Sequence, residues 1–205
     1  NGMIYSSASA LNLDGDIDGA IFSKDLSWEA DPKEEWQSLS KKQQHWVDIL
    51  NQGKVIQFQS EHTDISFKID QRIWINSDGK RNMPSGEVFT SPIGTSGEGY
   101  ITFDVPSLLF GKVIKGLRLE IKKGKVVKWA CANGKTLLDR LFSIKGADRV
   151  GEIAIGTNPY ICEPTLNTLF DEKIGGTIHM AIGASYPETG GKNDSGIHHD
   201  FITRF

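Results

Sequence analysis

Three short segments, Val55-Ile56-Gln57-Phe58, Ile65-Ser66-Phe67-Lys68-Ile69 and Arg72-Ile73-Trp74-Ile75, follow one another closely in the chain. They are rich in β-branched and aromatic residues, and their apolar side chains recur with a period of two, which is typical of strands. Turns separate them, and Asn76-Ser77-Asp78-Gly79 after the third segment is typical of another turn. These segments predict a sheet built from short strands.

The same pattern continues toward the C-terminus. We expect further strands at 98–103, 112–121, 124–130, 150–155, 176–182 and 197–202, with Lys123-Gly124 joining two of them as a hairpin. A helix is predicted at 134–144, with one apolar face formed by Leu137, Leu138, Leu141 and Phe142. Because strands dominate and the helices are segregated, the sequence predicts an α+β fold, a strand-rich mixed or antiparallel sheet with a few packing helices.

A second helix is predicted upstream of the first strand. Asp31 is suited to the N-cap, Pro32 to the first turn, and Gly53 to the C-terminal end. Between them, apolar residues recur every three or four positions and predict a buried face formed by Trp36, Leu39, Trp46, Val47 and Leu50. This helix is expected to pack against the sheet and to carry no chemistry.

Composition excludes several classes of protein. Of the 205 residues, 38% are apolar and 24% charged, and the net charge of −3 does not favour nucleic acid or anionic lipid. No apolar run approaches the roughly 20 residues that span a bilayer, and no secretory signal is evident. Cys131 and Cys162 are too few for a disulfide framework, so we expect free thiols and a cytoplasmic location. No nucleic-acid or membrane partner is expected.

Residues 1–30 differ from the rest, because they are rich in Ser, Ala, Gly and Asp and have little apolar periodicity. We expect them to be a linker or the remnant of a missing N-terminal domain, with a single domain over 31–205. Acidic residues between Asp14 and Asp25 fit the spacing of a calcium loop. No amphipathic helix precedes them, and a solvated acidic turn is the alternative.

Three of the five histidines lie in the last 27 residues. Side chains alternate along a strand, so His198 and Asp200 are predicted to share one face while His199 points to the other. Two such groups at i and i+2 on a rigid strand form half of a transition-metal site. His179 lies within another apolar strand. The alternative for each of them is a core histidine whose hydrogen bonds are satisfied, or a surface histidine.

Two glutamates also begin apolar segments. Glu87 follows the turn Met83-Pro84-Ser85-Gly86, and Glu152 follows Gly151. A carboxylate at the start of a buried strand is unfavourable unless it is paired or bound to a metal. An ordinary glutamate at the start of a strand is the alternative for each.

Five segments together resemble the thermophilic metallo-aminopeptidase family, the type of aminopeptidases T and S, over residues 30–205. They occur in the family's order and approximate spacing, at 82–90, 151–158, 169–183, 185–191 and 193–201. The resemblance implies a single metal-binding domain that corresponds to the C-terminal catalytic part of the family. It further implies metal ligands at Glu87, Glu152, His179, His198 and Asp200, with Tyr186 beside the site.

Five ligands exceed the three that hold a single catalytic zinc, but suit two divalent ions (Zn, Co or Mn) that share a carboxylate. We expect Glu152 to bridge the two ions and Tyr186 to stabilise the oxyanion of the reaction. Glu87 and Glu152 are the candidates for the general base. A triad of Ser195, His198 and Asp200 is disfavoured, because residues so close on one strand do not converge.

The resemblance implies hydrolysis of N-terminal residues from peptides with a free N-terminus, through a hydroxide activated by two metals. It also implies a homodimer and a preceding domain of roughly 200 residues, which the chain is expected to lack. The alternative function is therefore a metal-binding or assembly fragment without catalysis of its own.

Overall fold

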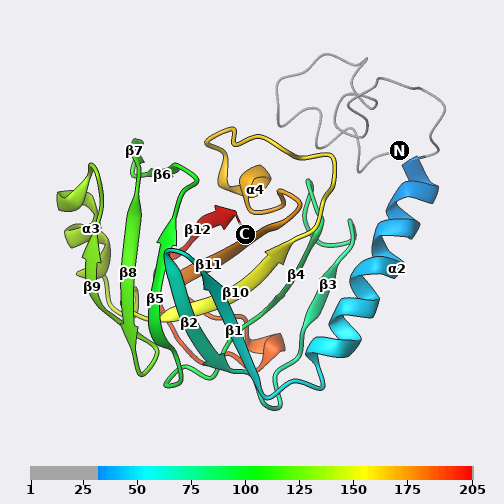
Figure 1. Cartoon of the computed structure of the whole chain (residues 1–205), viewed down its shortest axis with the longest axis horizontal. Helices are drawn as coiled ribbons and strands as arrows, with labels where there is room; N and C mark the ends of the chain where they lie inside the picture. Colours follow the sequence, from blue (N-terminus) through cyan, green and yellow to red (C-terminus); the bar gives the residue numbers. More distant parts are fainter. Residues whose placement is uncertain (1–31, 205) are drawn as a thin grey trace.

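Two five-stranded antiparallel sheets form the body of the protein, and helices cover their margins (Figure 1). The computed structural model describes residues 32–204. The predicted linker at 1–30, the acidic segment between Asp14 and Asp25, and the Asp31 N-cap lie outside the described residues. The α+β fold expected from the sequence is confirmed, and within residues 32–204 all pairings between named strands are antiparallel.

The first sheet has the strand order β1-β2-β5-β8-β9. Its strands are β1 (Val55–Ser60), β2 (Thr63–Lys68), β5 (Glu98–Phe103), β8 (Leu117–Lys122) and β9 (Lys125–Ala130). The predicted hairpin at Lys123-Gly124 is confirmed, with φ of 51° and 69°. Positive φ at both central residues gives a turn whose twist matches the strands that it joins.

The second sheet has the order β12-β11-β10-β4-β3 and carries the candidate site. Its strands are β3 (Ile75–Ser77), β4 (Glu87–Thr90), β10 (Val150–Gly156), β11 (Thr177–Gly183) and β12 (His198–Arg204). Every residue of β4 and β11 is buried, so this sheet is covered on both faces. One face packs against the first sheet, where the rings of Phe103 and Phe201 lie 5.6 Å apart.

The main core lies between the two sheets. The first sheet contributes Ile65, Phe67, Ile101, Phe103 and Leu119, and the second contributes Val88, Ile153, Met180, Ile182 and Phe201. Burying one such side chain stabilises a fold by about 1.5–3 kcal/mol. This shared core fixes the second sheet from one side and leaves its other face for polar side chains.

Helix α2 (Pro32–Leu50) runs along the edge of the second sheet, beside β3 (Figure 1). Trp36 and Val47 are buried as predicted. Trp46, also expected on the packing face, is 45% exposed, which corrects that prediction. The buried position on that turn belongs instead to Gln43, whose side chain donates to the carbonyl oxygens of Ser77 and Glu87. These hydrogen bonds replace the apolar contact.

The remaining elements are two helices, a two-stranded sheet and the 3-10 helix η1 (Pro187–Thr189). Helix α3 (Lys135–Phe142) buries Leu138 and Leu141 and stacks Phe142 on Trp129 of β9, with centroids 4.6 Å apart. The short helix α4 (Thr168–Asp171), for which no helix was predicted, interrupts the segment between β10 and β11. Strands β6 (Ser107–Leu109) and β7 (Lys112–Ile114) form a separate two-stranded sheet. None of the helices in residues 32–204 has the length and apolarity of a membrane span.

Most predicted strands end within two residues of their predicted bounds, but two differ more. The segment 112–121 is divided into β7 and β8, because Gly116 adopts φ of 60° and breaks the extended chain. The segment 72–75 contributes only its last residue to β3. The amide of Ile73 instead donates to the backbone oxygen of Thr189 in η1, and that of Trp74 donates to Oδ1 of Asn51 in the turn after α2. The turn expected at 76–79 accordingly begins later, since Asn76 and Ser77 are still in β3.

Candidate metal centre

A β-bulge at the start of β10 aims Glu152 away from the main core. Val150 pairs with Ile182 and Glu152 with Ala181, so Gly151 has no partner in the ladder. Val150 therefore points into the main core although Glu152, two residues later, points to the opposite face. A side chain at Gly151 would clash, because its Cβ would lie 2.3 Å from the backbone oxygen of Ala184.

The same face of the second sheet brings together the predicted side chains from four strands. Glu87 comes from β4, Glu152 from β10, His179 from β11, and both His198 and Asp200 from β12. Each of them has, on at least one side, a partner with little or no side chain: Glu87 has Gly156, His179 has Ala154, Glu152 and Asp200 have Ala181, and His198 has Gly183. On their other sides, His179 lies opposite Ile202 and Glu87 opposite Ser77. The small partners leave room between the polar groups where these face one another.

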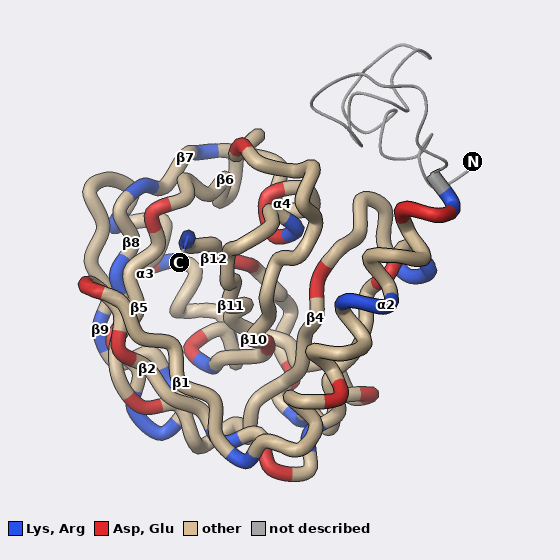
Figure 2. Tube along the Cα trace, turned by 45° about the vertical axis from the view of Figure 1, so that its right-hand side comes forward, with Lys and Arg blue, Asp and Glu red and all other residues tan. Residues whose placement is uncertain are grey.

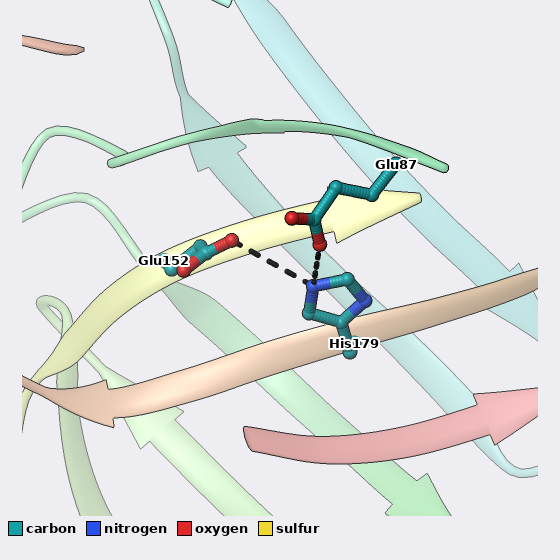
Figure 3. A group of neighbouring side chains, drawn as sticks. All are labelled: Glu87, Glu152 and His179. Atoms are coloured by element: carbon teal, nitrogen blue, oxygen red, sulfur yellow. Dashed lines mark ion pairs between the residues drawn. The ribbon is translucent and has the colours of Figure 1, made fainter. Parts of the chain in front are cut away.

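The side-chain atoms converge closely. Nε2 of His179 lies 3.1 Å from Oε2 of Glu87 and 3.6 Å from Oε1 of Glu152 (Figure 3). Nε2 of His198 lies 3.0 Å from the other Glu152 oxygen, Oε2, and 3.7 Å from Oδ2 of Asp200. The two carboxylate oxygens of Glu152 therefore face two different histidines.

These contacts define two groups of three potential ligands. One consists of Glu87, Glu152 and His179, the other of Glu152, His198 and Asp200, and in each group the ligand atoms lie within 4.8 Å of one another. Glu152 belongs to both groups. Two ions held in these groups would share one carboxylate, as in metal pairs that act on peptide and phosphate bonds.

Buried polar atoms without hydrogen bonds show that the residues fit a metal. Within the described part of the chain, Nδ1 of His179 and Oδ1 of Asp200 are buried and make no hydrogen bond. Oε2 of Glu87 and Nε2 of His179 also make none and meet only in the ion pairs given above. Such atoms are rare in folded proteins unless an ion or another ligand satisfies them. The donor set of carboxylate oxygens and imidazole nitrogens suits zinc, cobalt and manganese. His179 is not a core histidine with satisfied hydrogen bonds, and Glu87 and Glu152 are not exposed glutamates.

Electrostatics couple these groups strongly. Burial on its own raises the pKa of the Glu87 carboxyl, but Lys173 and His179 outweigh it and hold that pKa at about 2. Burial lowers the pKa of His198, whereas Glu152 and Asp200 together raise it to about 9. For Asp200, burial and the charge of Glu152 raise the pKa. Without an ion, both histidines of the site are therefore protonated at neutral pH.

The orientation of His198 is fixed by its other ring nitrogen. Nδ1 lies 2.8 Å from the carbonyl oxygen of Ala184 and is assigned as the donor, which directs Nε2 toward the site. His199 points to the opposite face, as strand alternation predicted, and contacts Ser107 Oγ at 2.9 Å. Ser195 Oγ donates to the backbone of Lys145, so it does not form a triad with His198 and Asp200.

Tyr186 lies beside the site in the loop after β11. Its ring packs between those of His198 and Phe89, at centroid distances of 5.0 and 5.2 Å, and its hydroxyl lies 3.5 Å from His198 Nε2. Burial raises the pKa of the phenol, and the nearby carboxylates raise it further, so the hydroxyl keeps its proton. Tyr186 is therefore available as a hydrogen-bond donor at the edge of the site.

Glu172 and Lys173 also belong to the site, and sequence reasoning assigned neither of them a role. Nζ of Lys173 lies 2.8 Å from Oε1 of Glu87 and also pairs with Glu172. Glu172 forms a third potential ligand group with His179 and Asp200. Burial and the charge of Asp200 raise the Glu172 pKa to about 8. The signal in the sequence was the charged run Asp171-Glu172-Lys173, which a solvated loop would explain equally well.

Comparisons with known proteins agree with the resemblance found in the sequence. Aminopeptidase PepS of Streptococcus thermophilus is 28% identical over 89% of this chain and 51% of its own length. Aminopeptidase 2 of Geobacillus stearothermophilus is 31% identical over 84% of this chain and 48% of its own length. The chain thus spans about half the length of these curated relatives.

Two solved structures share the fold. Wild-type AmpT from Thermus thermophilus superimposes with a TM-score of 0.76 and 25% identity, over 95% of this chain and 52% of that one. The 2,5-dihydroxypyridine dioxygenase of Pseudomonas putida KT2440 gives a TM-score of 0.67 at 20% identity, over 85% and 58%, a likeness of fold alone. The family model described as thermophilic metalloprotease (M29) matches residues 5–204. With this match over nearly its whole length, the chain belongs to the thermophilic metalloprotease (M29) family.

Proposed function

We propose that this chain is the metal-binding part of a metal-dependent aminopeptidase that works with two ions. The observation that carries this proposal is the pair of three-residue ligand groups that share Glu152. Glu87 and His179 complete one group, and His198 and Asp200 complete the other. The relatives named as aminopeptidases support the reaction class.

Two divalent ions, when bound, would supply a hydroxide nucleophile near neutral pH and polarise the scissile carbonyl. The chain's own residues hold and orient the reactants. Glu152 would bridge the two groups, because its two oxygens face different histidines. Tyr186 would donate a hydrogen bond to the carbonyl oxygen as negative charge develops there. Glu87 or Glu152 would act as the general base only through an oxygen that is not engaged as a ligand.

The relatives, which are named as aminopeptidases, favour a substrate with a free N-terminus. The charges of the site favour the metal ions. Four carboxyl groups are buried together, those of Glu87, Glu152, Glu172 and Asp200. When these carboxyl groups are deprotonated and the histidines are neutral, Lys173 is the only buried lysine or arginine of residues 32–204 that balances them, so the site attracts divalent cations.

The proposal is tested by measuring bound metal and turnover together. Purified protein is loaded with Zn²⁺, Co²⁺ or Mn²⁺ and assayed with aminoacyl-p-nitroanilides, with N-acetylated versions of the same substrates as the control. We expect two ions per chain and cleavage of the free-amine substrates only. Stoichiometric metal binding without turnover for any ion would contradict the aminopeptidase activity of this chain. The identity of the native ion, the homodimer and the cytoplasmic location stay predictions.

A further inference from the structure

A lysine with no exposed surface lies directly against the candidate metal ligands. The side chain of Lys173 is 0% exposed, and its Nζ contacts Glu87 and Glu172. Burying an ammonium group is strongly unfavourable unless its charge and its hydrogen bonds are both satisfied. The ammonium group of Lys173 is therefore confined to its position, because moving it away from Glu87 and Glu172 would leave buried charges unpaired.

The backbone around Lys173 is held from several sides. The amide of Lys173 donates to Phe170, and its carbonyl accepts from the amide of Asn158. Phe170 packs with Ile161 and Ile174 in a small apolar cluster next to the site. Figure 2 shows acidic and basic positions side by side at α4, in the segment that connects β10 to β11. The ammonium group is thus fixed by structure outside the second sheet.

Because of Lys173, the two carboxylate oxygens of Glu87 have different neighbours. Oε1 lies 2.8 Å from Nζ, so it is engaged with the ammonium group. Oε2 has no hydrogen-bond partner and lies 3.1 Å from Nε2 of His179, within the first ligand group. The lysine also holds Glu172, which otherwise completes a competing group with His179 and Asp200.

We propose that Lys173 is a positioning residue of the metal centre, which leaves Glu87 one oxygen for the ion and keeps Glu172 out of the coordination. This inference rests on the proposed function for the identity of the site, but it concerns metal binding rather than turnover. Residues that hold a metal ligand in place typically change metal affinity by about 10- to 100-fold when removed. In this proposal Lys173 acts through Glu87 and Glu172, the two carboxylates that its Nζ contacts.

The competing explanation is that Lys173 only balances the buried negative charge. Three variants separate the two explanations: Lys173→Met, Glu172→Gln and the double variant. Above pH 8, where Glu172 is ionised, the double variant removes one positive and one negative charge. Measured there, it keeps the net charge of the wild type while Glu87 still loses its partner. Glu172→Gln alone is the matched control, because it leaves the contact between Lys173 and Glu87 in place.

Zn²⁺ affinity and stoichiometry are measured by calorimetry, and the Co²⁺ absorption spectrum reports coordination geometry. We expect the double variant to bind one ion about 10- to 100-fold more weakly than Glu172→Gln does, with an altered Co²⁺ spectrum. If the double variant binds both ions as tightly as Glu172→Gln and gives the same spectrum, the positioning role is refuted and charge balance suffices. Failure of the proposed function would look different, since the wild type would bind ions without cleaving peptides.

A second measurement keeps the inference testable if the lysine variants do not fold. A crystal structure of the zinc-loaded wild type should show Glu87 bound to the ion through Oε2 alone, with Oε1 still on Lys173. Glu87 bound through both oxygens, or Glu172 coordinated to an ion, would overturn the proposal.

Discussion

The substitution Gly151→Ala tests whether the β-bulge at the start of β10 positions Glu152 in the metal centre. In Gly151→Ala, the added Cβ would lie 2.3 Å from the oxygen of Ala184 and 2.5 Å from that of Gly183. Both atoms are backbone, so the strand itself must shift. Forcing a methyl group into a packed region typically destabilises a protein by about 1–3 kcal/mol. For a chain of this size, that corresponds to a melting temperature lower by roughly 2–12 °C.

The same shift moves Glu152, which belongs to both ligand groups, so both ions should bind more weakly. Gly94→Ala is the matched control, because a Cβ there meets nothing within 4 Å. Thermal unfolding and Zn²⁺ titration are measured for both variants. Equal melting temperatures and equal affinities for Gly151→Ala and Gly94→Ala would refute the role assigned to the bulge.

Three further predictions follow from the site. Metal-free protein should lose stability as pH rises from 6.5 through about 9, because the pKa of folded His198 is raised, and as pH falls from 4.5 toward 2, because that of Glu87 is lowered. A flat denaturation midpoint across both windows would contradict these pKa shifts. Tyr186→Phe should lower kcat by about 100-fold, and unchanged kcat would remove the tyrosine from the reaction. His198→Ala should weaken metal binding while His199→Ala should not, which calorimetry checks directly; equal losses would contradict the assigned strand faces.

Much of the architecture follows from local pattern in the sequence. The alternation in β2 and β8 is visible because one face packs on the core while the other meets solvent. The same rule correctly separated His198 and Asp200 from His199, since strand geometry depends only on neighbouring residues. The prediction that Glu87 and His179 lie in one site came from the family resemblance, because strand order and register are not local properties of the sequence.

Other features depend on tertiary contacts and left no clear trace in the sequence. The bulge at Gly151 depends on the pairing of β10 with β11, and a glycine alone does not reveal it. Lys173 would be a surface residue by composition, and only the carboxylates around it explain its burial. Trp46 fits the apolar face of α2 by spacing, yet Gln43 takes the buried position because its amide satisfies two backbone carbonyls.

The central claim, two ions that share Glu152, is tested most directly by metal analysis with anomalous diffraction on the wild type and on Glu152→Ala. The account predicts two ions per wild-type chain, one in each ligand group and with Glu152 between them, and at most one ion in the variant. A single ion in the wild type, or two ions retained by Glu152→Ala, would contradict it.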